Sequence, residues 1–221
     1  MSAPTIDELT VAGDPESWSS LGFHVEDGRC LLGEVRLAFT GEAHEGGAPG
    51  LLGWTLRGIA TSELDGLPTQ PSDSGPRAPA PVHPNGVIAI DHIVAMSPAF
   101  PRSVEALREA GLDLRRIREE PTPAGAPRQA FFRLGEEILE LVQEPEGMVA
   151  RAGGSDRPAR FWGLAVVVED IERTVAALGD HGGEIRDAVQ PGRRIATVRR
   201  SAGLSIPLAL MSAGPRTDAV T

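Results

Sequence analysis

The chain has 221 residues and a formal net charge of −10, from 31 acidic and 21 basic side chains. That length suits one large domain or two small ones, and a hydrophobic share of 41% is ordinary for a folded globular protein. The negative charge disfavours nucleic acid and membrane surfaces as partners. The single cysteine, Cys30, excludes an internal disulfide. Without a signal-peptide pattern or a long apolar run, the expected location is the cytoplasm.

Residues 1–60 show a loose pattern of strands and one short helix. The first strand is expected in IDELTVAG, and the helix in DPESWSSLG, where Asp14 is the cap and Pro15 fits the first turn. Further strands are expected in FHVED and CLLGEVRLAFTG, and LLGWTLRGI resembles the start of a further unit. This order predicts a reduced βαβββ-like unit. Residues 61–87 hold six prolines and almost no apolar periodicity, so they are predicted to be a linker.

Two further blocks repeat one order of elements. Residues 88–146 are expected to give a strand, a helix and three strands, in VIAIDHIVAM, SPAFPRSVEALREAGL, LDLRRIREE, RQAFFRLG and EEILELVQ. After a second linker at 147–159, residues 160–213 are expected to give the same order, in RFWGLAVVV, a helix capped by Asp170, GEIRDAVQ, RRIATVRR and LSIPLALM. Residues 214–221 are expected to be a polar tail.

Units of this order in succession resemble the glyoxalase, bleomycin-resistance and extradiol-dioxygenase group, the vicinal oxygen chelate superfamily. The resemblance rests on IDHIVAM (90–96), FFRLGEEILELVQEP (131–145) and FWGLAVVVEDIERTVAALGDHGG (161–183). It implies an α+β fold in which repeated βαβββ units form a curved mixed sheet shaped like a cup. Residues 1–60 would add a third, reduced unit to this glyoxalase-like fold.

In this superfamily a metal lies in the cup, held by one residue from the first strand and one from the fourth strand of each unit. The resemblance implies His92 and Glu140 as the pair from the first unit, and an imidazole and a carboxylate suit Fe, Mn or Zn. The second unit departs from the pattern, with Gly163 and Leu208 at the aligned positions. Aligning IDEL with IDHI places Glu8 where His92 stands, so Glu8 is a third candidate metal ligand.

Three interpretations of His92 stay open. It can be a metal ligand, or it can form a metal-free acid–base pair in which Glu140 fixes one imidazole tautomer. It can also be a strand histidine with a satisfied hydrogen bond. Four candidate substrate-binding residues lie at the mouth of the cup or beside it: Arg194, Gln190, Gln129 and Phe132. A guanidinium there would clamp a carboxylate, and the competing interpretation of the arginine is an exposed strand charge.

The resemblance implies an enzyme of the lyase, isomerase or dioxygenase type. It would act on a small oxygenated metabolite, with His92 and Glu140 as catalytic residues and with or without a divalent metal. The alternative is a metal-free protein that binds or sequesters a small molecule, as bleomycin-resistance members do, and the lost ligands in the second unit fit that alternative better. A third hypothesis is a structural or regulatory module. The expected partner is a small-molecule ligand, with a homodimer as an open option.

Overall fold

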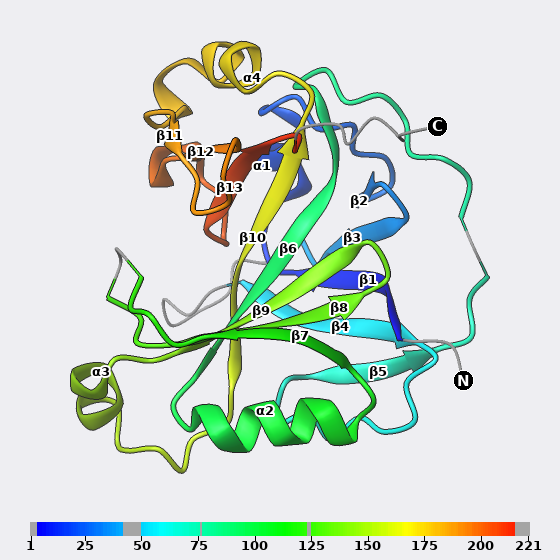
Figure 1. Ribbon diagram of the computed structural model, residues 1–221. Coiled ribbons are helices and arrows are strands. Elements are labelled where there is room, and N and C mark those ends of the chain that lie inside the picture. Colours follow the sequence, from blue (N-terminus) through cyan, green and yellow to red (C-terminus); the bar gives the residue numbers. More distant parts are fainter. Residues whose placement is uncertain (1–3, 42–49, 76, 123–124, 215–221) are drawn as a thin grey trace, which may run out of the picture.

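The larger of two sheets is built from two units with the same order of elements (Figure 1). The computed structural model describes residues 4–41, 50–75, 77–122 and 125–214. The first unit contains β6 (Val87–Ser97), α2 (Phe100–Glu109), β7 (Asp113–Arg118), β8 (Gln129–Leu134) and β9 (Glu137–Gln143). After α3 (Glu146–Arg151), the second contains β10 (Arg160–Val168), α4 (Ile171–Ala177), β11 (Arg186–Asp187), β12 (Arg194–Thr197) and β13 (Leu208–Ser212), with 3-10 turns at Gly179–His181 and Arg200–Ala202.

Strand pairing confirms the predicted βαβββ repeat. The eight strands run in the order β11-β12-β13-β10-β6-β9-β8-β7. In each unit the first strand runs parallel to the fourth, as β6 does to β9 and β10 does to β13. At the centre, β6 and β10 pair antiparallel and join the two units. The fold is therefore α+β, with both units in one open mixed sheet.

The N-terminal sheet repeats the centre of this pattern on a smaller scale. Its elements are β1 (Thr5–Val11), α1 (Pro15–Ser19), β2 (Arg29–Leu32), β3 (Val35–Phe39), β4 (Leu51–Arg57) and β5 (Thr69–Ser72). The strand order is β2-β3-β1-β4-β5, in which β1 is parallel to β3 and antiparallel to β4, and β4 is parallel to β5. The segment 61–87, predicted to be a linker, thus contributes a strand. An edge strand accommodates Pro71 because it leaves one side free of ladder hydrogen bonds.

Alternation along β6 gives the larger sheet one buried face and one open face. Ile93 and Ala95 are fully buried, whereas His92, Val94 and Met96 are partly exposed. Every second residue of a strand lies on the same side, so His92, Val94 and Met96 point away from the core. We call the side of the larger sheet that carries His92, Val94 and Met96 the open face.

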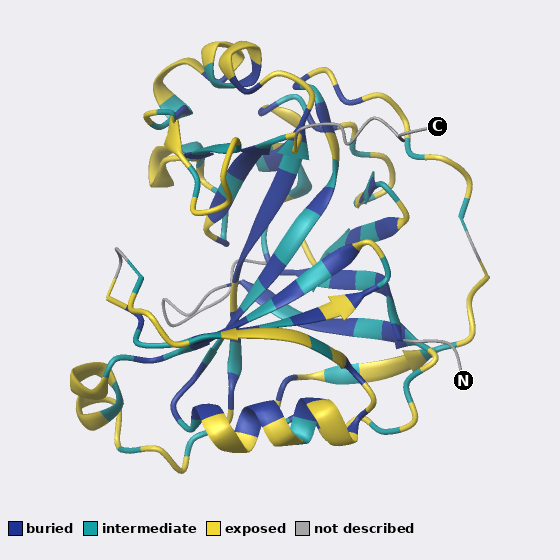
Figure 2. Cartoon of the chain, viewed as in Figure 1, coloured by how far each residue is buried: buried dark blue, intermediate teal, exposed yellow. Residues whose placement is uncertain are grey.

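The opposite, buried face packs against helices and the smaller sheet. Helix α2 contacts β9, and α4 contacts β12 and β13. Between the sheets, Trp54 of β4 meets Phe161 of β10 edge-on, with ring centroids 5.0 Å apart. Figure 2 shows buried residues concentrated in the central strands, while exposed residues cover the outer sides of the helices. None of the described helices has the length and apolar character that a membrane crossing needs.

One carboxyl group is enclosed on the buried face. Glu137, at the start of β9, is only 7% exposed. Burial raises the pKa of Glu137 to about 7, and the nearby charges of Glu136 and Glu34 act in the same direction. Because this folded-state value lies above the ordinary 4.5, the native carboxyl prefers its proton, and its contribution to stability is lost as the pH rises through about 7.

We therefore expect Glu137→Gln to stabilise the protein at pH 8 but hardly at pH 5. Glutamine has no proton to lose, so the free energy of unfolding at pH 8 should rise by about 1–3 kcal/mol. Urea titrations at the two pH values measure the difference. The matched control is Glu109→Gln, because that side chain is exposed on α2. An equal gain in both variants would show that burial of Glu137 is not the cause.

Candidate functional site

Five polar side chains meet on the open face: Asp91 and His92 of β6, Gln129 of β8, Glu140 of β9, and Arg193 just before β12. We call them the open-face cluster. His92 is central, with Nδ1 2.7 Å from Asp91 Oδ2 and Nε2 3.3 Å from Glu140 Oε2. Gln129 donates a hydrogen bond from Nε2 to Glu140 Oε1, and Arg193 Nη2 lies 2.5 Å from Asp91 Oδ1. The five groups form one continuous chain of contacts.

Strand register explains why His92 and Glu140 meet. In the parallel pairing of β6 with β9, Ile138 stands opposite His92 and Glu140 stands opposite Val94. The two polar residues therefore share the open face, two residues apart along neighbouring strands. Their side chains are 16% and 14% exposed, so both are mostly buried but reach the surface. The predicted proximity is present in the structure, and the chemical roles of the pair stay predictions.

Asp91 reaches the cluster because β6 carries a bulge. His92 pairs with Ala165 of β10 and Ile90 pairs with Val166, so Asp91 between them has no partner residue. A bulged residue leaves the strict alternation of the strand, and here Asp91 turns to the side of His92. Sequence reasoning missed Asp91 because period 2 assigns it to the buried face. The available signal was a pair of successive polar residues inside an apolar strand.

Arg193 reaches the cluster from the second unit. Ala196 of β12 is buried opposite Leu210, which places Arg194 on the buried face and Arg193 on the open face. Arg193 Nε donates to the carbonyl of Ser212 at 2.9 Å, which holds the guanidinium beside Asp91. Sequence reasoning had chosen Arg194 of this pair. The register of β12 places Arg193, and not Arg194, on the open face.

Asp91 is held as a carboxylate. Burial raises its pKa, but the hydrogen bonds from His92 and Arg193 outweigh burial, so the pKa of Asp91 lies below its usual range. Because an ionised Asp91 accepts at Oδ2, the Nδ1 atom of His92 carries a proton. The other ring nitrogen then faces Glu140 Oε2. With a proton on Nε2 as well, His92 can donate to Glu140 at this contact.

Of the predicted substrate-binding residues, Gln129 belongs to the cluster and the other three do not. Phe132 is fully buried opposite Leu139, whereas Phe131 stands opposite Glu140 on the open face. Gln190 is exposed in the turn before β12. The Arg194 side chain pairs with Glu172 of α4.

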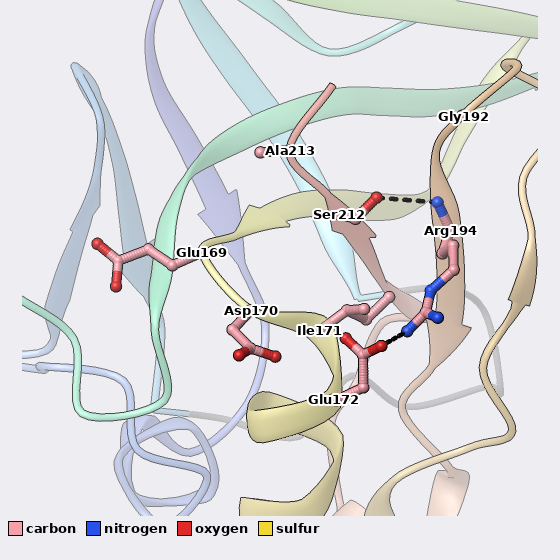
Figure 3. A pocket seen from close by; sticks show the side chains of 8 residues that line it. All are labelled: Glu169, Asp170, Ile171, Glu172, Gly192, Arg194, Ser212 and Ala213. Carbon is pink, nitrogen blue, oxygen red and sulfur yellow. Dashed lines mark hydrogen bonds and ion pairs between the residues drawn. The ribbon is translucent and has the colours of Figure 1, made fainter. Parts of the chain in front are cut away.

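Arg194 borders a separate hollow at the start of α4 (Figure 3). The hollow measures about 610 Å³ and is lined by Glu169, Asp170, Ile171, Glu172, Gly192, Arg194, Ser212 and Ala213. The backbone N–H of Arg194 donates to Ser212 Oγ at 2.9 Å, and its guanidinium is bound to Glu172. No side chain of the open-face cluster lines this hollow, so it is distinct from the candidate site.

The side chains of the second unit do not fit the superfamily's four-ligand metal site. Leu208 pairs with Leu164 on the buried face, and the neighbouring Ala209 occupies the open face instead. At Gly163, a Cβ atom would lie 2.8 Å from the carbonyl oxygen of Pro207, so a histidine would require the backbone to move. At these two positions the second unit therefore offers neither an imidazole nor a carboxylate to a metal.

Glu8 lies in the smaller sheet rather than beside His92, and its carboxylate pairs with Arg36 of β3. The alignment of IDEL with IDHI is matched in the geometry, because β1 carries a bulge at Asp7 as β6 does at Asp91. Glu8 thus takes the place of His92 within its own sheet. Across the described parts of the chain, no three His, Cys, Asp or Glu side chains are grouped to hold a metal ion.

Comparison with known proteins identifies the class to which this fold and site belong. Residues 89–202, just over half of the chain, match the family model described as the Glyoxalase/Bleomycin resistance protein/Dioxygenase superfamily. The chain belongs to this superfamily, which confirms the resemblance seen in the sequence. No curated protein matches the chain.

Two solved structures illustrate the likeness. Methylmalonyl-CoA epimerase from Mycobacterium tuberculosis is 16% identical, with a TM-score of 0.48, over 59% of this chain and 91% of that chain. A xylose isomerase-like TIM barrel/4-hydroxyphenylpyruvate dioxygenase fusion protein is 13% identical, with a TM-score of 0.58, over 97% of this chain and 50% of that chain. The chain thus spans half the length of the fusion protein. At this identity the match shows the fold, and it covers both sheets.

We expect Arg193→Met to raise the pKa of Asp91, because burial would then be opposed by His92 without the guanidinium. The imidazole resonances of His92 should shift and broaden, since its Nδ1 partner is less firmly held. Carbon-detected NMR of the Asp91 carboxyl and proton–carbon spectra of the imidazole measure both effects. Arg194→Met is the matched control, and an unchanged Asp91 in Arg193→Met would show that the two do not interact in solution.

Proposed function

We propose that this chain is an enzyme of the superfamily that moves a proton at a carbon atom of a small oxygenated substrate. The substrate lies on the open face, and the His92–Glu140 pair transfers the proton without a resident metal. The observation that carries the proposal is the engagement of both ring nitrogens of His92 by carboxylates, at 2.7 and 3.3 Å. Such an arrangement fixes the imidazole and leaves one mobile proton next to a carboxylate, which suits acid–base catalysis.

Glu140 acts as the base in this proposal. It takes a proton from the carbon beside a carbonyl group, and the C–H electron pair moves into the carbonyl to form an enolate. The Nε2 proton of His92 then goes to the enolate oxygen, which gives an enol. The proton on Glu140 passes to Nε2 across 3.3 Å and restores the pair. Returning a proton to a different carbon or face yields an isomer.

The rest of the open face supports a small, partly apolar substrate. Val94, Phe131 and Ile138 share the face with the cluster and offer apolar contacts to a carbon skeleton. The guanidinium of Arg193 pairs with Asp91, so the negative charge beside the His92 ring is balanced by a positive one. Polar groups that fix orientation within an apolar surround are typical of sites for small molecules.

A second candidate function is binding without chemistry. The observation that favours it is the open face of the second unit, where Gly163, Ala165 and Ala209 carry no polar side chain. A ligand would be held there by shape and apolar contact alone. In that case His92 and Glu140 would orient the polar end of the ligand and transfer nothing.

Deuterium exchange separates the two candidates. The protein is incubated in D2O with 2-oxo acids, 2-hydroxy ketones and 3-oxo acids, and proton NMR follows the C–H signal beside each carbonyl. The enzyme proposal expects exchange above the buffer rate that is lost in His92→Gln and kept in His181→Gln, whose imidazole lies outside the cluster. Binding without exchange would support the second candidate. The homodimer that the sequence leaves as an open option stays a hypothesis, and light scattering measures the oligomeric state.

A further inference from the structure

Gln129 carries a hydrogen-bond acceptor that none of the described residues uses. The residue is 8% exposed, and its Nε2 donates to Glu140 Oε1. Its Oε1 atom is buried and has no hydrogen-bond partner among the described residues. Exchanging the amide oxygen and nitrogen would turn the oxygen toward the Glu140 carboxylate, so the present orientation is the favourable one. A buried acceptor left without a donor is destabilising, and a ligand that donates would relieve it.

A largely buried cation lies on the neighbouring strand, at the position opposite Gln129. Arg118 of β7 is opposite Gln129 in the strand register, so both lie on the open face. The Arg118 side chain is 20% exposed, and its ion-pair partner within the described residues is Glu120, at 3.6 Å and with a side chain 72% exposed. A pair of this length with an exposed carboxylate is weak. Arg118 can therefore receive another anion.

We propose that the open face binds a carboxylate with a hydroxyl donor on the adjacent carbon. The carboxylate pairs with Arg118, and the hydroxyl donates to Gln129 Oε1. The strands β7, β8 and β9 are neighbours in that order, about 4.8 Å apart, so a small ligand meets Arg118, Gln129 and Glu140 in succession. Both 2-hydroxy acids and the enol forms of 2-oxo acids have this chemistry. The placement of the reacting carbon at Glu140 rests on the proposed function, while the binding of the other two groups does not.

Gln129 is the specificity-determining residue in this proposal. A ketone oxygen at the same place would set one acceptor against another, whereas a hydroxyl satisfies the buried Gln129 Oε1. Sites built around a buried polar group reject analogues that leave the group unpaired. The open face should therefore prefer an alcohol or enol over the ketone of the same skeleton.

Mandelate and phenylglyoxylate test this preference, because they share a ring and a carboxylate and differ in hydroxyl against ketone. By titration calorimetry, the wild type should bind mandelate at least about 10-fold more tightly than phenylglyoxylate. In Gln129→Met the ratio should fall to about 1, since the acceptor is gone. Arg118→Gln should weaken both ligands by a similar factor. Gln143→Met is the control, because the amide oxygen of Gln143 on β9 already accepts from Arg128. This variant should leave the ratio unchanged.

Equal affinities in the wild type, or no binding of either acid, would overturn the proposal. Phenylpyruvate distinguishes the two sources of the hydroxyl. If its C3 protons exchange in D2O above the buffer rate, the bound hydroxyl is that of an enol. If mandelate is preferred and phenylpyruvate does not exchange, the ligand is a 2-hydroxy acid. The result also separates this inference from the proposed function. Mandelate preference with no exchange on any carbonyl compound keeps the inference and rejects the enzyme. Exchange without mandelate preference does the reverse.

Discussion

Glu140→Gln is expected to lower the rate of substrate deuterium exchange by at least about 100-fold, the scale that a positioned general base contributes. The amide keeps the shape of the carboxylate and can still accept a hydrogen bond from Gln129, so the open face should retain its form. It cannot take a proton from carbon at neutral pH. The loss should therefore fall on the rate at saturating substrate, while the affinity for mandelate changes little.

The control for this variant is Glu136→Gln, an exposed carboxylate on the same hairpin. Its exchange rate and mandelate affinity should match those of the wild type. If Glu140→Gln keeps more than about a tenth of the rate, Glu140 is not the base, because losing a true base costs more than that. If affinity and rate fall together, Glu140 acts in binding rather than in proton transfer.

Asp7→Ala is expected to destabilise the protein by about 3–5 kcal/mol, the cost of breaking a buried ion pair by removing one partner. Asp7 is buried in the bulge of β1, where Arg57 and Arg77 pair with its carboxylate and Ser72 donates to it at 2.7 Å. Both guanidinium side chains are mostly buried as well. Without Asp7, two enclosed cations would face each other with no anion between them.

Urea unfolding followed by tryptophan fluorescence measures this loss, because Trp54 lies in the same sheet. The matched control is Asp73→Ala, an exposed carboxylate directly after Ser72 in the chain. Burial raises the pKa of Asp7, but the hydrogen bonds from Arg77 and Ser72 and the charges of Arg77 and Arg57 lower it further, so it lies below the ordinary value. The stabilisation is thus present above pH 4 and is lost as the pH falls through the folded-state pKa. A loss under about 1 kcal/mol at pH 7 would contradict a buried ion pair.

The fold could be predicted wherever a strand has one buried face. Apolar runs of strand length predict β6 and β10, and the helix signals between the strands predict the order of elements in each unit. Strand β5 was not predicted, because it has four residues, includes Pro71 and shows no apolar alternation. An edge strand of this kind is defined by its partner β4 and not by its own sequence.

The site was predictable in part. His92 and Glu140 follow from the alternation of their strands together with the family pattern. Asp91 was not predictable from alternation, because a bulge takes it out of the period. Arg194 and Phe132 lie on the buried face, whereas their neighbours Arg193 and Phe131 lie on the open face, and both differences have one shared reason.

Each of those differences depends on strand register, and a shift of one residue exchanges the two faces of a strand. The same shift explains why Leu208 aligned with Glu140 although Ala209 lies on the open face. Pairing partners fix the register, and a single strand sequence with apolar residues on both faces does not reveal it.

Deuterium exchange by the wild type after removal of metal ions is the most direct test of proton transfer by the His92–Glu140 pair. The protein is dialysed against EDTA, its metal content is measured by mass spectrometry, and exchange is followed by proton NMR with and without added Zn, Mn or Fe(II). The expected result is a full rate in the stripped protein and no gain from any added metal. A rate that disappears on dialysis and returns with one of these ions would contradict the mechanism and make His92 and Glu140 metal ligands.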